Sequence, residues 1–160
     1  VVAHVETLAP ALSNRKTTLG GDIESWDAEY SVDGSSVKFS HIEPDGGVDE
    51  DGLRLRENAY ENESALWLWR ALTLDEGYDG RYVSVSAVRR NQVAVRLRVV
   101  QQEWVEVPAG SFATWRLQVR SGRATRVAWI GIEPPYPLVR WDNGEQIFRL
   151  LSLNEGRGRP

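Results

Sequence analysis

A period of two between apolar and polar residues runs through most of the chain, and this pattern excludes most folds other than a β-sheet. In the clearest run, residues 92–99, valine or leucine alternates with polar side chains such as Arg96 and Arg98. Residues 112–120 repeat the pattern, with Trp115, Leu117 and Val119 expected inward and Thr114 expected outward. Such alternation is typical of antiparallel strands that are buried on one face.

Turn-forming dipeptides separate these runs where hairpins require them. Asp33-Gly34, Ser121-Gly122 and Asn143-Gly144 are the strongest signals. We therefore predict about nine to eleven antiparallel strands. No β-α-β alternation is recognisable, so we expect no parallel pairing. The expected strands include residues 24–32, 37–42, 52–57, 81–89, 92–99, 112–120, 126–130 and 146–151.

One segment, residues 64–72, breaks the period of two. It is rich in helix formers and apolar on almost every side, and Asn62 or Ser64 is available as its N-cap. A helix of this kind must be covered, and the concave side of a curved sheet would cover it. The predicted fold class is all-β with one short helix: a curved antiparallel sheet, or an incompletely closed β-barrel, wrapped round the helix.

The composition is that of an ordinary globular protein of one domain. The chain has 160 residues, of which 41% are hydrophobic and 26% charged. We predict a single domain over residues 1–154 and a flexible tail over residues 155–160. The first 80 residues carry a formal charge of −11 and the last 80 carry +7, for a net charge of −4. Because the net charge is negative, we expect no nucleic-acid partner.

Several kinds of functional site have little support. The absence of cysteine excludes thiolate chemistry, and neither His4 nor His41 lies in a catalytic or metal-binding motif. The acidic segment 45–52 does not have EF-hand spacing, so we predict a solvated hairpin loop rather than a calcium site. We expect no metal and no cofactor. Two carboxylate pairs, Asp75/Glu76 beside Tyr78 and Glu103/Glu106 flanking Trp104, remain candidates for acid–base chemistry.

Aromatic and arginine residues offer a better candidate site. Seven tryptophans is a high number for this length, and 17 of the 19 basic residues are arginine. The aromatic residues either fill the core or line a groove for an apolar or ring-bearing ligand. Arginines on the polar strand faces either stabilise a wet surface or bind an anionic head group. The candidate ligand-binding residues are Tyr60, Trp67, Trp69, Tyr78, Tyr82, Trp115, Arg116, Arg126, Trp129 and Tyr136.

Several motifs carry a resemblance to a known family. They are the segment 105–117 (VEVPAGSFATWRL), Ala128-Trp129 followed by the segment 135–140 (PYPLVR), and the segment 59–78 that contains the expected helix. Together they resemble an uncharacterised family of exported bacterial β-rich domains, which is akin in fold to the lipoprotein carriers LolA and LolB. The resemblance covers residues 55–152 and implies a half-closed barrel round a helix. It implies no catalytic residues.

These observations give two functional hypotheses. The first is a non-enzymatic exported domain, periplasmic or on the cell surface, that binds an apolar or amphipathic molecule on a concave aromatic side. The second is a small barrel enzyme that uses carboxylates and tyrosines in the same cavity. The chain does not begin with Met, so an upstream leader that anchors the protein to a membrane is part of the expectation. The oligomeric state is predicted to be a monomer or a salt-sensitive homodimer.

Overall fold

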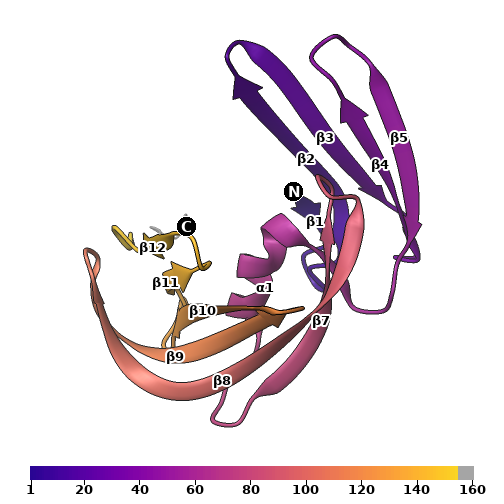
Figure 1. The fold of residues 1–160 in the computed structure, drawn as a ribbon. Helices are drawn as coiled ribbons and strands as arrows, with labels where there is room; N and C mark the ends of the chain where they lie inside the picture. The colour runs from indigo at the N-terminus through magenta and orange to yellow at the C-terminus, as the bar shows by residue number, and fades with distance from the viewer. Residues whose placement is uncertain (155–160) are drawn as a thin grey trace, which may run out of the picture. The chain divides into compact units, whose positions relative to one another are not determined.

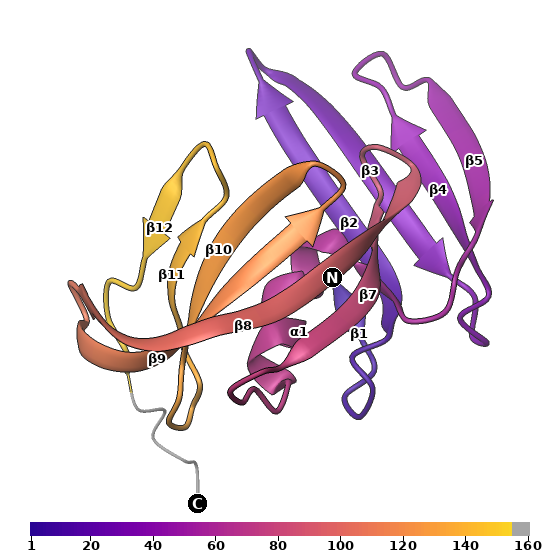
Figure 2. The ribbon, with the colours of Figure 1, turned by 60° about the horizontal axis from the view of Figure 1, so that its bottom comes forward.

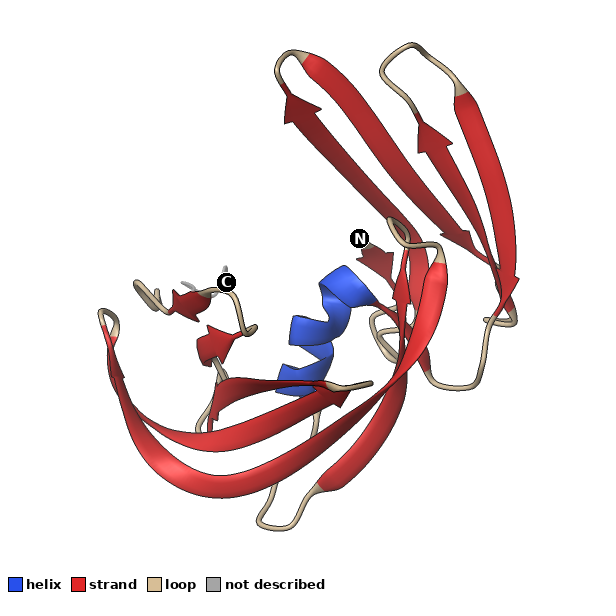
Figure 3. Cartoon of the chain, viewed as in Figure 1, coloured by secondary structure: helices blue, strands red, loops and turns tan. Residues whose placement is uncertain are grey.

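A computed structural model describes residues 1–154, and its strands form two sheets (Figure 1). One sheet has the order β1-β2-β3-β4-β5 and the other the order β12-β11-β10-β9-β8-β7-β6. The strands are β1 (Val2–Ala3), β2 (Pro10–Leu19), β3 (Asp22–Tyr30), β4 (Ser36–Ile42), β5 (Val48–Arg54), β6 (Ala59–Glu61), β7 (Asp79–Ser86), β8 (Asn91–Val107), β9 (Gly110–Ser121), β10 (Ala124–Gly131), β11 (Leu138–Asp142) and β12 (Ile147–Arg149). The α-helix is α1 (Ala65–Ala71), which stands out among the strands in Figure 3.

The described chain divides into two compact units. The first contains Val1–Leu68 and Tyr82–Val95, and the second contains Trp69–Arg81 and the chain from Arg96 onward. The single-domain prediction for residues 1–154 stays a prediction, and the predicted tail, residues 155–160, lies outside the described residues.

The first unit is built on an antiparallel meander whose register follows the period of two. Ala28 lies opposite Phe39, and Tyr30 lies opposite Val37, so these four side chains share the buried face of β3 and β4. Phe39 is 1% exposed. The predicted turn at Asp33-Gly34 joins the two strands, and hydrogen bonds from Ser31 and Ser35 lower the pKa of Asp33 to about 2.

The acidic segment 45–52 is mostly strand and not the solvated loop that the sequence analysis predicts. Only its start is a turn, and Val48–Arg54 forms β5, the edge strand of the meander. All its side chains except that of Leu53 are exposed, which explains why an acidic sequence is tolerated there. Lys38 and Arg90 form ion pairs with Glu50 and Asp49, respectively.

A β-α-β unit lies at one edge of the seven-stranded sheet, contrary to the expectation of purely antiparallel pairing. Strand β6 leads into a 3₁₀ turn at Asn62–Ser64 and α1, and it pairs in parallel with β7, so that Ala59 lies opposite Val83. The cap is neither Asn62 nor Ser64. Glu61 occupies the N-cap position and its carboxylate accepts a hydrogen bond from the Glu63 backbone N–H.

Glu61 is a buried carboxyl group, 2% exposed, and burial raises its pKa above the usual 4.5. Burial raises the pKa of the Tyr30 phenol as well, and the nearby charge of Glu61 adds to this. Because the folded-state pKa of Glu61 is above its unfolded value, its contribution to stability is present below about pH 4.5 and is lost as the pH rises through the folded-state pKa.

We therefore expect Glu61→Gln to become more stable relative to the wild type as the pH increases from 4 to 8, since a neutral amide carries no desolvation penalty for charge. Urea unfolding of both proteins at the two pH values measures this difference. Glu61→Ala also removes the cap, which should cost about 0.5–2 kcal/mol at either pH. An unchanged difference between wild type and Glu61→Gln would show that burial does not control this carboxyl group.

The second unit is a curled antiparallel sheet. Strands β8 and β9 bend strongly, so the part of the sheet that belongs to this unit, from Arg96 of β8 to β12, forms an open half-barrel (Figures 1 and 2). Leu117, Ala128, Ile130 and Val139 are at most 2% exposed and form part of its core. Together with α1, this curled sheet confirms the predicted class, an all-β fold with one short helix.

The C-terminal half of α1 belongs to this second unit and is fixed there by two side chains. The Trp69 ring is 3% exposed and lies 5.0 Å from the ring of Trp141 on β11. Arg70 donates hydrogen bonds from Nε to the Tyr136 carbonyl (2.8 Å) and from Nη2 to the Pro135 carbonyl (2.9 Å). The helix is not covered on every side, however, because Trp67 in the first unit is 64% exposed.

Two of the predicted strand faces are wrong in detail. Thr114 is fully buried, not outward, and its hydroxyl donates to the Glu103 carbonyl at 2.8 Å. This hydrogen bond is what allows a polar side chain to be buried. Val93, expected inward, is 41% exposed, while Val95, Leu97 and Val99 are buried as predicted.

Candidate functional site

The best candidate site is a pocket on the second unit, where strands β8 to β11 lie side by side. Its volume is about 330 Å³. Trp129 is almost completely buried, at 7% exposure, whereas Trp104 is 74% exposed. Trp104 lies between Glu103 and Val105, whose side chains contact Trp129, so its indole points to the opposite face of β8 and Trp129 forms the aromatic wall of the pocket. The lining residues are Glu103, Trp104, Val105, Glu106, Arg116, Trp129 and Arg140.

Hydrogen bonds fix the orientation of Trp129. Its indole Nε1–H donates to Oε1 of Glu103 at 2.5 Å, and the backbone carbonyl of Glu103 accepts from the buried Thr114 hydroxyl. The Trp129 ring packs in a cluster with Val105, Val107 and Val139. Since both its ring and its N–H are engaged, Trp129 is held in one position and can serve as a fixed surface for neighbouring groups.

Two guanidinium groups lie against the Trp129 ring. The Cζ of Arg140 is 4.6 Å from the ring centroid, and the Cζ of Arg116 is 5.9 Å from it. The strand register explains this arrangement, because Trp129 lies opposite Arg116 on β9 and opposite Arg140 on β11. Cation–π attraction stabilises such contacts by about 0.5–2 kcal/mol.

The electrostatics of the pocket are incompletely balanced. Nε of Arg116 lies 3.9 Å from Glu103 Oε1, which makes a long ion pair. Nε of Arg140 is buried and has no hydrogen-bond partner among the described residues. A buried donor without a partner costs about 1–3 kcal/mol, so an anion that reached it would gain that energy.

The other predicted site residues of the second unit pack or form hydrogen bonds outside this pocket. Trp69 is a core residue, and Trp115 and Tyr78 are half-buried. Burial raises the pKa of Tyr78, and the charge of Asp79 adds to this. Arg126 is exposed and donates from Nε to the Asn143 carbonyl at 3.1 Å. Tyr136 is 45% exposed, and its carbonyl accepts from Arg70. Of the predicted residues, only Arg116 and Trp129 line the pocket on β8 to β11.

The remaining three predicted residues belong to the first unit. The rings of Tyr60 and Tyr82 meet edge to face with centroids 6.2 Å apart, and Tyr82 is buried. Trp67 lines a second pocket, of about 350 Å³, together with Glu63, Ser64 and residues near the N-terminus. This pocket has an apolar wall and one carboxylate, and none of its lining residues is an arginine or a lysine.

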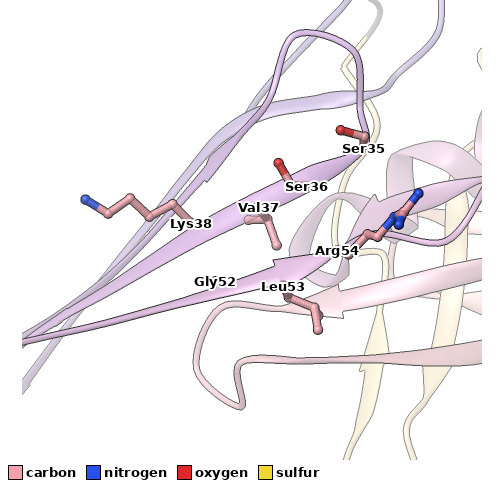
Figure 4. A pocket seen from close by; sticks show the side chains of 7 residues that line it. All are labelled: Ser35, Ser36, Val37, Lys38, Gly52, Leu53 and Arg54. Carbon is pink, nitrogen blue, oxygen red and sulfur yellow. The ribbon is translucent and has the colours of Figure 1, made fainter.

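A third, wider depression of about 590 Å³ lies along the β4–β5 pair (Figure 4). Its side chains come from adjacent residues of two paired strands and do not converge on one point (Figure 4). Lys38 already pairs with Glu50 at 2.9 Å, and Val37 is buried in the core. We therefore do not assign a site to this depression.

The other chemical candidates do not form a catalytic or metal site. His41 stacks on Trp26 with centroids 4.9 Å apart, and its Nε2 is buried without a hydrogen-bond partner in the described part of the chain. Asp75 and Glu76 lie on an exposed turn. Across residues 1–154, no three His, Asp or Glu side chains are grouped closely enough to hold a metal ion. No helix in this range has the length and apolar character to cross a membrane.

Arg140 is the site residue that the sequence analysis missed. It stands between Val139 and Trp141 in a short apolar strand. A single arginine within an apolar strand is a signal that the side chain has a specific partner, because an unpaired charge is costly to bury. The sequence suggests Glu103 only as half of a carboxylate pair with Glu106, but its partners in the structure are Trp129 and Arg116.

Comparison with known proteins identifies a family and nothing closer. A protein-family model described as "Protein of unknown function (DUF3108)" matches residues 1–147. No curated protein and no solved structure matches the chain.

Proposed function

The chain belongs to this DUF3108 family, and we propose that it is a non-enzymatic binding domain that holds an amphipathic anion in the pocket on β8 to β11. One observation carries the proposal: the guanidinium groups of Arg116 and Arg140 both lie against the Trp129 ring, next to Val105, in one pocket. The aromatic and valine surface can contact an apolar chain while the guanidinium groups contact a negative head.

The lining residues favour binding over catalysis. The seven residues that line the pocket are two Glu, two Trp, two Arg and one Val, so none supplies a hydroxyl, imidazole or amine nucleophile. The Glu106 side chain alternates with Val105 and Val107, which pack on Trp129, and so points to the other face of β8. Glu103 is engaged as an acceptor for Trp129. The buried carboxyl group of Glu61, which an enzyme hypothesis would require in a cavity, lines none of the three pockets described above.

The matching test compares the two pockets. We expect decanoate to bind the protein in isothermal titration calorimetry, and Arg116→Gln to weaken binding by about 5- to 10-fold, because it removes a charge-assisted contact to the carboxylate head. Trp67→Ala is the control for the other pocket: Trp67 lines that pocket in the first unit, so its removal should leave the affinity unchanged. Loss of binding in Trp67→Ala alone would place the ligand in the pocket of the first unit and contradict the proposal.

We further propose that this binding domain acts in an exported protein of a bacterial cell envelope. The support is the resemblance of residues 55–152 to exported domains that are akin in fold to LolA and LolB. An amphipathic ligand is consistent with such a place, since lipids and their derivatives are abundant there. Fractionation of the producing cell tests this location, and recovery in the cytoplasm would contradict it.

A further inference from the structure

The pocket on β8 to β11 is part of a longer row of side chains that crosses four strands. Arg116 on β9 lies opposite Trp129 on β10, Trp129 lies opposite Arg140 on β11, and Arg140 lies opposite Arg149 on β12. Residues directly opposite each other in antiparallel strands point to the same face of the sheet. One tryptophan and three arginines therefore follow a single line, with neighbouring strands about 4.8 Å apart.

The charges along this row are not neutralised by the protein. Among the described residues, Glu103 is the one carboxylate within 4 Å of any of the three guanidinium groups, and it contacts only Arg116. Arg140 and Arg149 have no such partner in residues 1–154, although like charges placed directly opposite each other are destabilising. Arg140 also has the buried Nε without a hydrogen-bond partner. A row of three positive charges with one internal carboxylate leaves an excess of two.

We propose that the head group of the ligand is a phosphate monoester held by Arg140 and Arg149, with Arg116 as the third cation. This inference rests on the proposed function and specifies the chemistry of the same site. A phosphate monoester carries about −1.5 to −2 charges at pH 7 and three acceptor oxygens, which matches the excess charge of the row. The planar guanidinium group binds such oxygens in pairs, and it is better suited to this than a lysine.

The Glu103 carboxylate competes with the head group of the ligand for Arg116. Its carboxylate is the negative charge nearest to Arg116 and lines the same pocket. Replacing it by glutamine keeps an oxygen that can accept the Trp129 N–H but removes the charge. We therefore expect Glu103→Gln to bind a phosphate head about 3- to 10-fold more tightly than the wild type, because it removes a like-charge repulsion from the site.

The test compares ligands that share one chain and differ in the head group. Calorimetry with decyl phosphate, decanoate and decanol, each below its micelle concentration, should give about tenfold tighter binding of decyl phosphate than of decanoate at pH 8. This preference should decrease below about pH 6, where the phosphate loses its second charge. Arg149→Gln should weaken the binding of decyl phosphate by about tenfold and the binding of decanol by less than about twofold. Arg149 is exposed, so the variant should fold, and thermal unfolding confirms this.

Arg123→Gln is the matched control, since Arg123 is an exposed arginine of the same unit at the β9–β10 turn and not in the row. It should leave all three affinities unchanged. Equal affinity for decyl phosphate and decanoate, with weaker binding of decanol, overturns the head-group inference but leaves the proposed function standing. Equal binding of all three ligands, or binding of none of them, overturns the proposed function itself. Glycerol phosphate, which has no alkyl chain, tests the apolar part of the ligand. Much weaker binding than that of decyl phosphate supports the inference with a lipid phosphate, and equally tight binding contradicts the amphipathic ligand of the proposed function.

Discussion

Trp69→Ala is expected to lower the free energy of unfolding by about 3–5 kcal/mol, the range found for truncating a buried aromatic side chain to alanine. Trp69 is 3% exposed and contacts the ring of Trp141 at a centroid distance of 5.0 Å. Alanine would leave a large cavity at the point where the helix meets β11. Urea unfolding followed by circular dichroism measures the loss.

Two further variants separate packing from other effects at this position. Trp67→Ala removes the same side chain two residues earlier in the same helix, but at a site that is 64% exposed, so it should change stability by no more than about 0.5 kcal/mol. Trp69→Phe keeps an aromatic ring and removes an Nε1–H that is buried without a hydrogen-bond partner among the described residues. Trp69→Phe should therefore lower the free energy of unfolding by clearly less than Trp69→Ala does. Equal losses in Trp67→Ala and Trp69→Ala would contradict the assigned packing.

Phe39→Ala is expected to cost a similar amount, about 3–5 kcal/mol, in the first unit. Phe39 is 1% exposed and packs in a cluster with Ala28, Val37 and Val85. Phe148 is the matched control, because it is a strand phenylalanine with 51% exposure, and Phe148→Ala should have an effect of less than about 1 kcal/mol. The same urea experiment gives both values, and a larger loss in Phe148→Ala would overturn the assignment of the core.

The pair Trp69→Ala and Phe39→Ala also tests the domain prediction. They act on different compact units, so a single cooperative domain over residues 1–154 requires both to shift one and the same transition. If one variant splits the transition into two steps, the units unfold separately and the single-domain prediction is wrong.

The sequence predicts most hairpins well because their signals are local. Asp33-Gly34 lies within the five residues that join β3 to β4, and the hydrogen bonds of Ser31, Asp33 and Ser36 close that turn. Edge strands are harder to predict, since the backbone alone pairs β5 with β4 and its side chains need not alternate. The parallel pair β6–β7 is harder still, because β6 is only three residues long and its partner follows after a helix.

The difference between local turn signals and pairings without such signals also explains what could be predicted of the candidate site. The Ser121-Gly122 turn fixes the register of β9 against β10, and this register brings Arg116 opposite Trp129. Both residues were therefore accessible to sequence reasoning. The position of Arg140 was not, because the register between β10 and β11 shifts by an irregularity between Trp129 and Ile130. A shift of one residue changes which side chain lies opposite Trp129, and the sequence carries no visible signal for it.

The order of the strands also has a kinetic consequence. In both sheets each strand neighbours the strand that precedes or follows it in the chain, so almost every pairing closes a short loop. Short loops lose little entropy on closure, and proteins dominated by local contacts fold faster than β-proteins with distant pairings. Isolated hairpins form within about 1–10 μs. The exception is β6, which can pair with β7 only after the chain through α1 has turned back. We therefore expect the β6–β7 pair to form later than the hairpins.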